Sequence, residues 1–193
     1  MRVSTVLRDY QEDLAQRIEG RHAEGHKHVM GVLPTGGGKT RLIAHFATRW
    51  SNDLSAQIAH RQELLMQIAM ALAESGVHHR IIAPEPVVRF ISDVQIEKLK
   101  RTYVHGQAPA AVVSVDTLNA RADKLALWFK QVKGVQGDEG HHWLMLNKWG
   151  RAYTQFPNVA KGILWTATPR RSDRKSLLDG EGGICTVMEC GPT

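Results

Sequence analysis

The segment PTGGGKT (34–40) combines the residue types that bind a chain of phosphates. Consecutive glycines let backbone N–H groups converge on an anion without obstruction by side chains. The ammonium of Lys39 can reach the β- and γ-phosphates of a nucleotide, and the hydroxyl of Thr40 can ligate Mg²⁺. We therefore predict a site for ATP and Mg²⁺ formed by Thr35, Gly36, Gly37, Gly38, Lys39 and Thr40.

The flanking sequence favours a phosphate loop over a chance glycine turn. An apolar strand candidate, HVMGVL (28–33), leads into the segment, and an amphipathic helix candidate begins at Lys39. The N-terminus of that helix adds the positive end of its dipole to the site. The pattern G-x-x-x-x-G-K-[ST] is missed only at its first position, where Leu33 stands.

Two adjacent carboxylates, Asp138 and Glu139, supply a second part of such a site. An aspartate at the C-terminal end of a parallel strand faces the crevice in which these sheets bind ligands. Asp138 can then hold Mg²⁺ through a water molecule, and Glu139 can polarise the attacking water. An Asp-Glu pair alone is common in surface turns, so this prediction depends on the phosphate loop and on the two histidines that follow, His141 and His142.

The elements that must position these residues alternate along the chain. Apolar runs predict strands at 28–33, 56–60, 80–84, 110–115, 162–169 and 184–190. Apolar spacing of three and four residues predicts helices at 39–50, 61–75, 92–101 and 118–130. Strands that alternate with helices predict parallel β-α-β units in one open α/β sheet. The segment VKGVQG (132–137), before the acidic pair, is a poor buried strand because glycine and lysine fit such strands badly.

Length and composition limit the classes of protein that fit. The chain has 193 residues, which corresponds to one domain, and it has no apolar run long enough for a transmembrane helix. Its start lacks the apolar stretch of a signal peptide, so we expect a cytoplasmic protein without a membrane partner. The net charge of +6 suits contact with nucleic acid but does not require it. Cys185 and Cys190 lack a second pair that would complete a zinc site.

Six segments, taken in chain order, resemble the motifs of superfamily 2 helicases and translocases. They are LRDYQ (7–11), LPTGGGKT (33–40), IAHRQELLMQ (58–67), SVDTL (114–118), DEGHH (138–142) and TATP (166–169). The likeness is to the DEAH-type motor domain of restriction helicase subunits, especially type III, and of many phage helicases, with Gly140 in place of the usual alanine. The resemblance implies that residues 1–193 form a first RecA-like domain, an open and mainly parallel sheet flanked by helices, in a phage or bacterial protein.

The resemblance also implies roles for individual residues on the nucleotide side. Arg8 and Gln11 fall in the segment that reads adenine, and the Gln11 amide can make two hydrogen bonds with the edge of that base. His141 is similar to the histidine that couples the ATP site to the TATP motif, represented here by Thr166 and Thr168. The implied catalytic residues are Lys39, Asp138, Glu139 and His141, and the implied ligands of Mg²⁺ are Thr40 and Asp138.

Three further residues are expected to contact nucleic acid. His60 and Arg61 lie where a strand passes into a helix, and Thr117 lies in the motif after the next strand. Such groups contact phosphates and therefore bind with little sequence preference. For Arg61 and Thr117 the alternative is an ordinary exposed residue at the start of a helix. Tryptophans on apolar faces are predicted to be core rather than platforms for bases: Trp143, Trp149 and Trp165.

The expected partners are DNA, with double-stranded DNA favoured and RNA not excluded, and a second RecA-like domain in cis or in trans. That second domain would bring arginines to the γ-phosphate, so the chain alone is expected to have low ATPase activity. Arg170 and Arg171 are expected to face the cleft between domains without reaching this phosphate. Two alternatives are a nucleotide-regulated binding module without productive hydrolysis and a small nucleotide kinase, in which the Asp-Glu-x-His and TATP segments would have no use.

Overall fold

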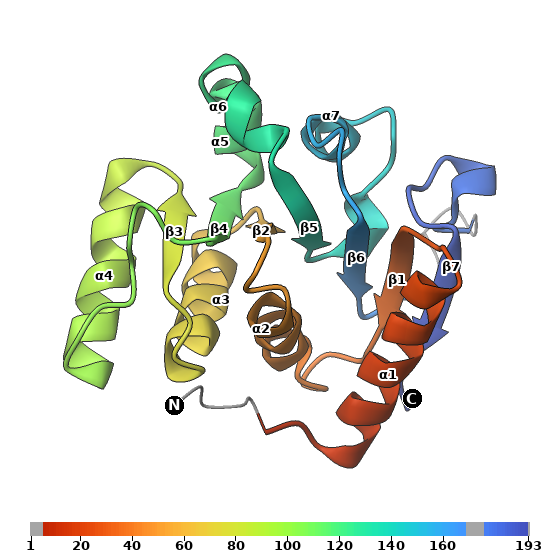
Figure 1. Ribbon diagram of the computed structural model, residues 1–193, viewed down its shortest axis with the longest axis horizontal. Helices are drawn as coiled ribbons and strands as arrows, with labels where there is room; N and C mark the ends of the chain where they lie inside the picture. Colours follow the sequence, from red (N-terminus) through yellow and green to blue (C-terminus); the bar gives the residue numbers. More distant parts are fainter. Residues whose placement is uncertain (1–5, 169–175, 193) are drawn as a thin grey trace.

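A seven-stranded parallel sheet forms the centre of the computed structural model, which describes residues 6–168 and 176–192. The strand order is β3-β4-β2-β5-β6-β1-β7 (Figure 1). The strands are β1 (His28–Val32), β2 (Leu54–Ala59), β3 (His79–Ile82), β4 (Ala110–Ser114), β5 (Val132–Gly137), β6 (Lys161–Thr166) and β7 (Val187–Cys190). The predicted α/β class with an open parallel sheet is confirmed.

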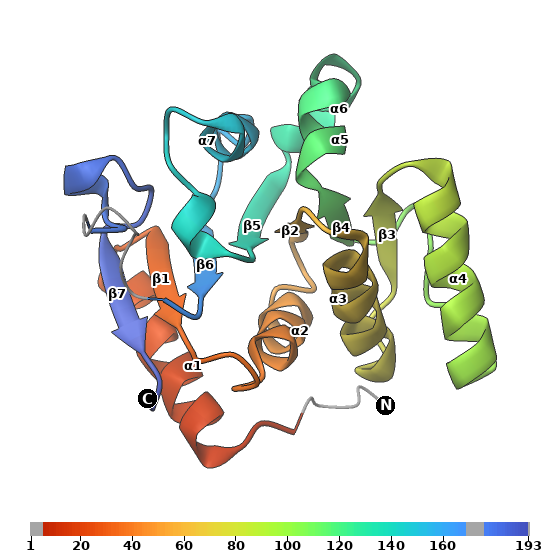
Figure 2. The same ribbon diagram turned by 180° about the vertical axis from the view of Figure 1, so that it is seen from behind.

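Helices cover both faces of the sheet, so two apolar cores form, one on each side. The helices are α1 (Asp9–Ala23), α2 (Lys39–Arg49), α3 (Gln62–Glu74), α4 (Glu85–Leu99), α5 (Val115–Ala120), α6 (Ala122–Phe129) and α7 (Lys148–Thr154). Figure 2 shows α1, α2 and α3 on one face and α5, α6 and α7 on the other, with α4 beside the edge strand β3. None of the described helices is both long and apolar enough to cross a bilayer.

Two of the predicted helices have different bounds in the structure. The helix expected at 92–101 begins at Glu85, because Pro86 lies in its first turn, where a missing N–H costs no hydrogen bond. The helix expected at 118–130 is two helices, α5 and α6, that are separated at Arg121. The sequence pattern also left out α1 and the short helix α7, which carries Trp149.

The segment 132–137, a poor strand candidate by its composition, forms the central strand β5. A Cβ atom on Gly134 would collide with the ring of Trp50, and one on Gly137 would lie 2.5 Å from Cζ2 of Trp143. The glycines therefore make room for tryptophan rings on the two faces of the sheet. The three tryptophans that were predicted to be core residues are buried: Trp143 is 1% exposed, Trp149 5% and Trp165 0%. That prediction is confirmed.

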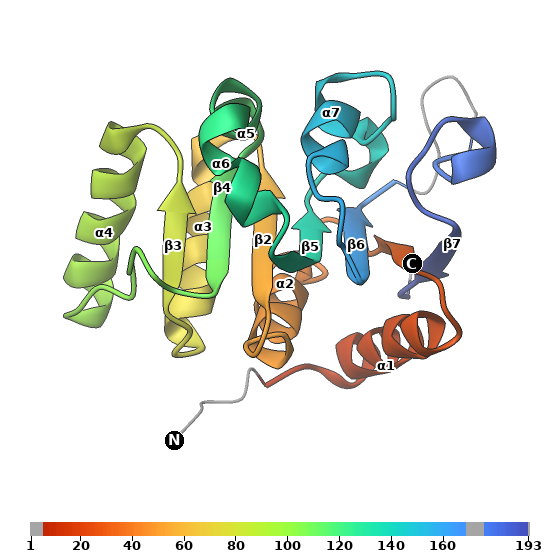
Figure 3. The same ribbon diagram turned by 45° about the horizontal axis from the view of Figure 1, so that its top comes forward.

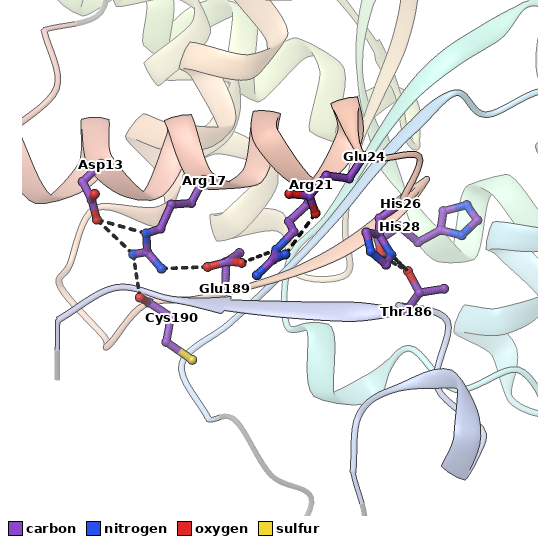
Figure 4. Close-up of polar contacts among 9 residues, drawn as sticks. All are labelled: Asp13, Arg17, Arg21, Glu24, His26, His28, Thr186, Glu189 and Cys190. Atoms are coloured by element: carbon purple, nitrogen blue, oxygen red, sulfur yellow. Dashed lines mark hydrogen bonds and ion pairs between the residues drawn. The ribbon is translucent and has the colours of Figure 1, made fainter.

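An ion-pair cluster fastens α1 to the edge strand β7. The nearly buried carboxylate of Glu189 accepts hydrogen bonds from Arg17 Nη1 at 2.7 Å and from Arg21 Nε at 2.6 Å (Figure 4). Arg17 also donates from Nη2 to the carbonyl oxygen of Cys190 at 2.8 Å. Because β7 pairs with β1, this cluster fixes α1 relative to the strand that leads into the 34–40 loop.

Candidate active site

The carboxyl ends of the parallel strands bring the predicted site residues to one edge of the sheet (Figure 3). The 34–40 loop follows β1, and the acidic pair follows β5. His60 follows β2, which pairs with β5 in a register that sets Ile58 opposite Gly137. Thr166 ends β6, opposite Val32 of β1. Ligands of open α/β sheets bind at this edge.

The glycines of the 34–40 loop have the backbone conformations that a phosphate loop requires. Gly36 has φ of 79° and Gly38 has φ of 88°, both in the left-handed region that side chains disfavour. A Cβ atom on Gly37 would lie 2.7 Å from Cγ of Leu33, and one on Gly38 would collide with the Gln11 amide. Only glycine fits these positions without rearrangement.

Lys39 begins α2 and turns back over the loop. Its Nζ donates to the carbonyl oxygens of Leu33 at 3.1 Å and Pro34 at 3.4 Å. Thr35 is exposed on the loop, and Thr40 lies partly exposed in the first turn of α2. The loop therefore presents an ammonium, a hydroxyl and a helix N-terminus together, which are the groups that bind a phosphate chain with its cation.

The segment before α1 braces the loop. Gln11, which is 2% exposed, donates from Nε2 to the carbonyl oxygen of Gly37 at 2.9 Å and accepts from the backbone N–H of Arg8. The hydroxyl of Tyr10 donates to the same Gly37 oxygen at 3.1 Å. The guanidinium of Arg8 is exposed beside Tyr10. The structure thus brings Arg8 and Gln11 to the loop as expected, and it adds Tyr10, whose role the sequence did not indicate.

A cavity of about 620 Å³ opens beside the loop, between α2 and α3. Gly38, Thr40 and Arg41 line it on the loop side, and Met66 and Met70 line it on the α3 side. This volume lies in the range of small-molecule sites, and the lining mixes apolar residues with polar and charged ones such as Gln67 and Glu74. The cavity is therefore a candidate place for the base of a nucleotide whose phosphates lie on the loop.

Asp138 is a buried acid with an unsatisfied oxygen. The residue is 9% exposed, and its Oδ1 atom has no hydrogen-bond partner among the described residues. Burial raises the pKa of this carboxyl above its ordinary value, while the charge of Lys39 acts in the opposite direction. An unpaired buried carboxylate is costly, and oxygen ligands are those that Mg²⁺ prefers. The carboxylate of Asp138 and the hydroxyl of Thr40 thus form a donor set that fits Mg²⁺.

Glu139 lies in a strained turn beside Asp138. Its φ of 54° and ψ of 51° are in the left-handed region, which is unusual for a residue other than glycine and is concentrated at functional sites. Nδ1 of His141 lies 3.4 Å from the Glu139 carboxylate and 3.2 Å from Oγ1 of Thr166. The Thr166 hydroxyl oxygen also accepts from the backbone N–H of Thr168 at 3.1 Å. The structure therefore joins four predicted residues in one network of polar contacts: Glu139, His141, Thr166 and Thr168.

Gly140, which stands where the resembled motif has alanine, is closely packed. A Cβ atom here would lie 2.8 Å from Sδ of Met30 and 3.1 Å from the carbonyl oxygen of Trp165. The long side chain of Met30 thus occupies space that an alanine methyl group would need.

His60 and Arg61 lie beside the acidic turn, at the start of α3. Arg61 is exposed, and its Nε donates to Nε2 of His60 at 3.1 Å. Burial, followed by the charge of Arg61, lowers the pKa of His60. Thr117 lies at the same edge in α5 but is only 7% exposed, so little of its side chain is accessible to a phosphate.

Sequence and structure comparisons identify relatives of the chain. The family described as type III restriction enzyme, res subunit, matches residues 4–171. The chain belongs to this family. The res-subunit domain is 28% identical over 189 residues to the putative ATP-dependent helicase IRC3 of Saccharomyces cerevisiae, a match that covers 89% of this chain and 25% of the yeast protein.

The fold of the res-subunit domain is also that of solved helicases. It is similar to the UvsW helicase of bacteriophage T4 (TM-score 0.63, 16% identity, 95% of this chain and 59% of that chain). It is likewise similar to the Hef helicase domain of Pyrococcus furiosus (TM-score 0.66, 16% identity, 95% of this chain and 37% of that chain). The chain thus has the fold of these two helicase domains, and it spans about a quarter of its yeast relative.

The helix α7 begins beside the site, and its N-cap residue Asn147 was not predicted to have a role there. The side-chain oxygen of Asn147 caps the helix by accepting from the N–H groups of Trp149 and Gly150. The buried ring of Trp149 contacts the rings of His60 and His142. In the sequence, Asn147 could have indicated the start of this helix, because asparagine is a favoured N-cap residue. The helix has only seven residues, which is too short for a clear apolar period. Arg170 and Arg171 lie outside the described residues.

Proposed function

We propose that this res-subunit domain binds and hydrolyses Mg²⁺·ATP as the first motor domain of a nucleic-acid-dependent ATPase, a DNA helicase or translocase. One observation carries the proposal. The buried Oδ1 of Asp138, which has no hydrogen-bond partner among the described residues, lies at the same sheet edge as the glycine loop that carries Lys39. The two groups suit a cation and a phosphate chain, respectively.

Each residue has a distinct task in this proposal. Lys39 and the backbone of 36–38 bind the phosphates, and Thr40 with Asp138 would hold Mg²⁺, which supplies positive charge near the phosphates. Glu139 accepts the proton of the attacking water, since its carboxylate lies next to Asp138 and is about one-third exposed. His141 orients the Glu139 side chain. Because His141 also contacts Thr166, a movement of Glu139 shifts Thr166 and the neighbouring Thr168.

The base of ATP is proposed to lie against the Gln11 segment. The two hydrogen bonds to adenine that were expected of Gln11 are not both available, because its Oε1 accepts from Arg8 and one amide hydrogen binds Gly37. One amide hydrogen remains for an acceptor on adenine, in a side chain that is only 2% exposed. Arg8 is exposed nearby, and the cavity between α2 and α3 adjoins the loop at Gly38 and Thr40.

Nucleic acid is proposed to cross the edge formed by the ends of β2 and β4. Arg61 is an exposed cation there, and its Nε donates to His60. Thr117 lies at the same edge, in α5, but is mostly buried, so its contribution is proposed to be smaller. Such contacts go to the backbone, so we expect little sequence preference. The resemblance favours double-stranded DNA over RNA. It also favours a DEAH-type, phage or bacterial protein that acts in the cytoplasm.

A second RecA-like domain, in cis or in trans, is proposed to complete the site. Charge that develops on the γ-phosphoryl group is stabilised in such enzymes by an arginine finger, which is worth roughly 10³–10⁵ in rate. Asp138, Glu139 and Lys39 all lie on the same wall of the site, so the chain alone is expected to bind ATP and turn it over slowly.

Single-turnover ATP hydrolysis, with and without duplex DNA of random sequence, tests this function. The chain alone should hydrolyse bound ATP slowly, and a longer protein that includes the second domain should do so faster when DNA is added. ATP binding without hydrolysis in the longer protein would instead support a nucleotide-regulated binding module.

A further inference from the structure

The first turn of α7 lies between the segments that the proposed function assigns to nucleic acid and to ATP. Lys148 forms an ion pair of 2.9 Å with Asp116 of α5. On the other side, Nδ2 of Asn147 donates to the carbonyl oxygen of His142 at 2.8 Å. The turn is therefore fastened both to α5 and to the acidic segment 138–142.

A continuous series of ring contacts crosses the same place. The ring of Trp149 meets the ring of His60 edge-on, with 5.1 Å between centroids and 74° between planes. It stacks nearly parallel on the ring of His142, with 5.6 Å and 19°. The ring of His142 in turn lies 4.1 Å from that of His141. We call His60, Trp149 and His142 the ring stack.

The ring stack lies between exposed Arg61 on one side and Glu139, the proposed water-activating acid, on the other. His141 connects the stack to Glu139. Arg61 donates to Nε2 of His60, so the proton of the neutral His60 ring lies on Nδ1. That Nδ1 atom is buried and has no hydrogen-bond partner among the described residues. His60 is thus oriented by Arg61 and by ring packing. At the opposite end, His141 lies 3.4 Å from the Glu139 carboxylate.

We propose that the ring stack transmits the binding of a nucleic-acid backbone at Arg61 to Glu139, with His142 as a positioning residue. This inference rests on the proposed function. A phosphate that engages Arg61 changes the hydrogen bond that orients His60, and closely packed rings pass such a shift on because they cannot interpenetrate. His142, between Trp149 and His141, sets where the His141 ring can lie.

The exposure of His142 makes this role separable from folding. The side chain lies at the surface, whereas Trp149 belongs to the core. His142→Ala removes one ring of the stack and leaves Arg61 and Glu139 in place. His142→Phe restores a flat ring that cannot titrate. His105→Ala removes an exposed imidazole that precedes β4, at the opposite edge of the sheet, and serves as the matched control.

The test is the thermodynamic coupling between the two ligands. Fluorescence anisotropy measures the Kd of a labelled random-sequence duplex, without and with a saturating, non-hydrolysable ATP analogue and Mg²⁺. In the wild type the analogue should change this Kd by about fivefold or more. In His142→Ala the change should fall below about twofold, although each ligand alone binds within about threefold of wild type. His142→Phe and His105→Ala should keep the wild-type coupling.

The possible failures can be told apart. Full coupling in His142→Ala, or no coupling in a wild type that binds both ligands, would overturn the inference and leave the proposed function intact. Weaker binding of DNA alone by His142→Ala would also overturn it, because His142 would then act as a contact. A wild type that binds neither ligand would overturn the proposed function and this inference with it.

Discussion

Nδ1 of His141 lies 3.2 Å from Oγ1 of Thr166, which joins the acidic turn after β5 to the end of β6. The same nitrogen is 3.4 Å from the Glu139 carboxylate, so one imidazole touches both the proposed water-activating acid and the TATP segment. The Thr166 hydroxyl oxygen also accepts from the N–H of Thr168. A change at Glu139 can therefore reach Thr168, in the segment after β6, through three polar contacts.

Glu139→Gln should separate nucleotide binding from hydrolysis. The amide keeps the shape of the side chain but cannot accept a proton from water, so turnover should fall by at least about 10²-fold. The affinity for Mg²⁺·ATP should stay near that of wild type. Single-turnover hydrolysis and calorimetry on a protein that includes the proposed second domain measure the two quantities. If the variant lost ATP binding but turned over bound ATP at the normal rate, Glu139 would not be the group that accepts the proton from water.

Asp138→Asn should weaken the dependence of nucleotide binding on Mg²⁺. Replacing the buried carboxylate removes the charge that attracts the cation, so the Mg²⁺ concentration for half-maximal binding should rise by about tenfold. Burial raises the pKa of Asp138, so the ionised group costs stability at neutral pH, and the variant should melt no lower than wild type at pH 7. If the Mg²⁺ titration of the variant matched that of wild type, Asp138 would not be a ligand of Mg²⁺.

The strand and helix around the 34–40 loop could be predicted because their apolar periods are strong. The convergence of Asp138, His60 and Thr166 on that loop was implied only by the family resemblance, since it depends on the strand order β2-β5-β6-β1 and not on spacing along the chain. The strand β5 looked poor in sequence because its glycines are explained only by the tryptophans that pack on them. The helix α4 begins at Glu85, with Pro86 in its first turn, and not at residue 92, where the apolar spacing placed its start.

His79 should make folding stability depend on pH. Its ring is buried between the carbonyl oxygen of Val77 and the Gln95 amide, and burial lowers its pKa to about 4. The unfolded state takes up the proton near pH 6.5, so this contribution is complete above that pH and is lost as pH falls toward 4. Between pH 7 and pH 4.5 the loss should be about 2–3 kcal/mol.

Urea unfolding at the two pH values measures this contribution. His79→Gln should flatten the pH dependence by that amount. His78→Gln removes an exposed imidazole whose charge is the smallest of the influences on the pKa of His79, so it should change the pH dependence much less. Equal pH dependence in the wild type and His79→Gln would show that the His79 ring does not resist protonation.

Glu189→Gln should loosen α1 from β7. The change removes the charge that accepts from both Arg17 and Arg21, so the melting temperature should fall by about 2–8 °C. Asp13→Asn is the matched control, because this exposed carboxylate pairs with Arg17 within α1 and should cost less than about 2 °C. Equal melting temperatures in the two variants would mean that the link between α1 and β7 contributes little.

The central claim is that the 34–40 loop binds the phosphates of ATP, and the most direct measurement is calorimetric titration of Mg²⁺·ATP into wild type and Lys39→Ala. Lys39 bonds only to loop carbonyl oxygens of Leu33 and Pro34 among the described residues, so the variant should fold normally. A charge-assisted contact to phosphate is worth about 1.5–3 kcal/mol, so the Kd should rise by about tenfold to a hundredfold. Equal affinities in the wild type and the variant would contradict the account.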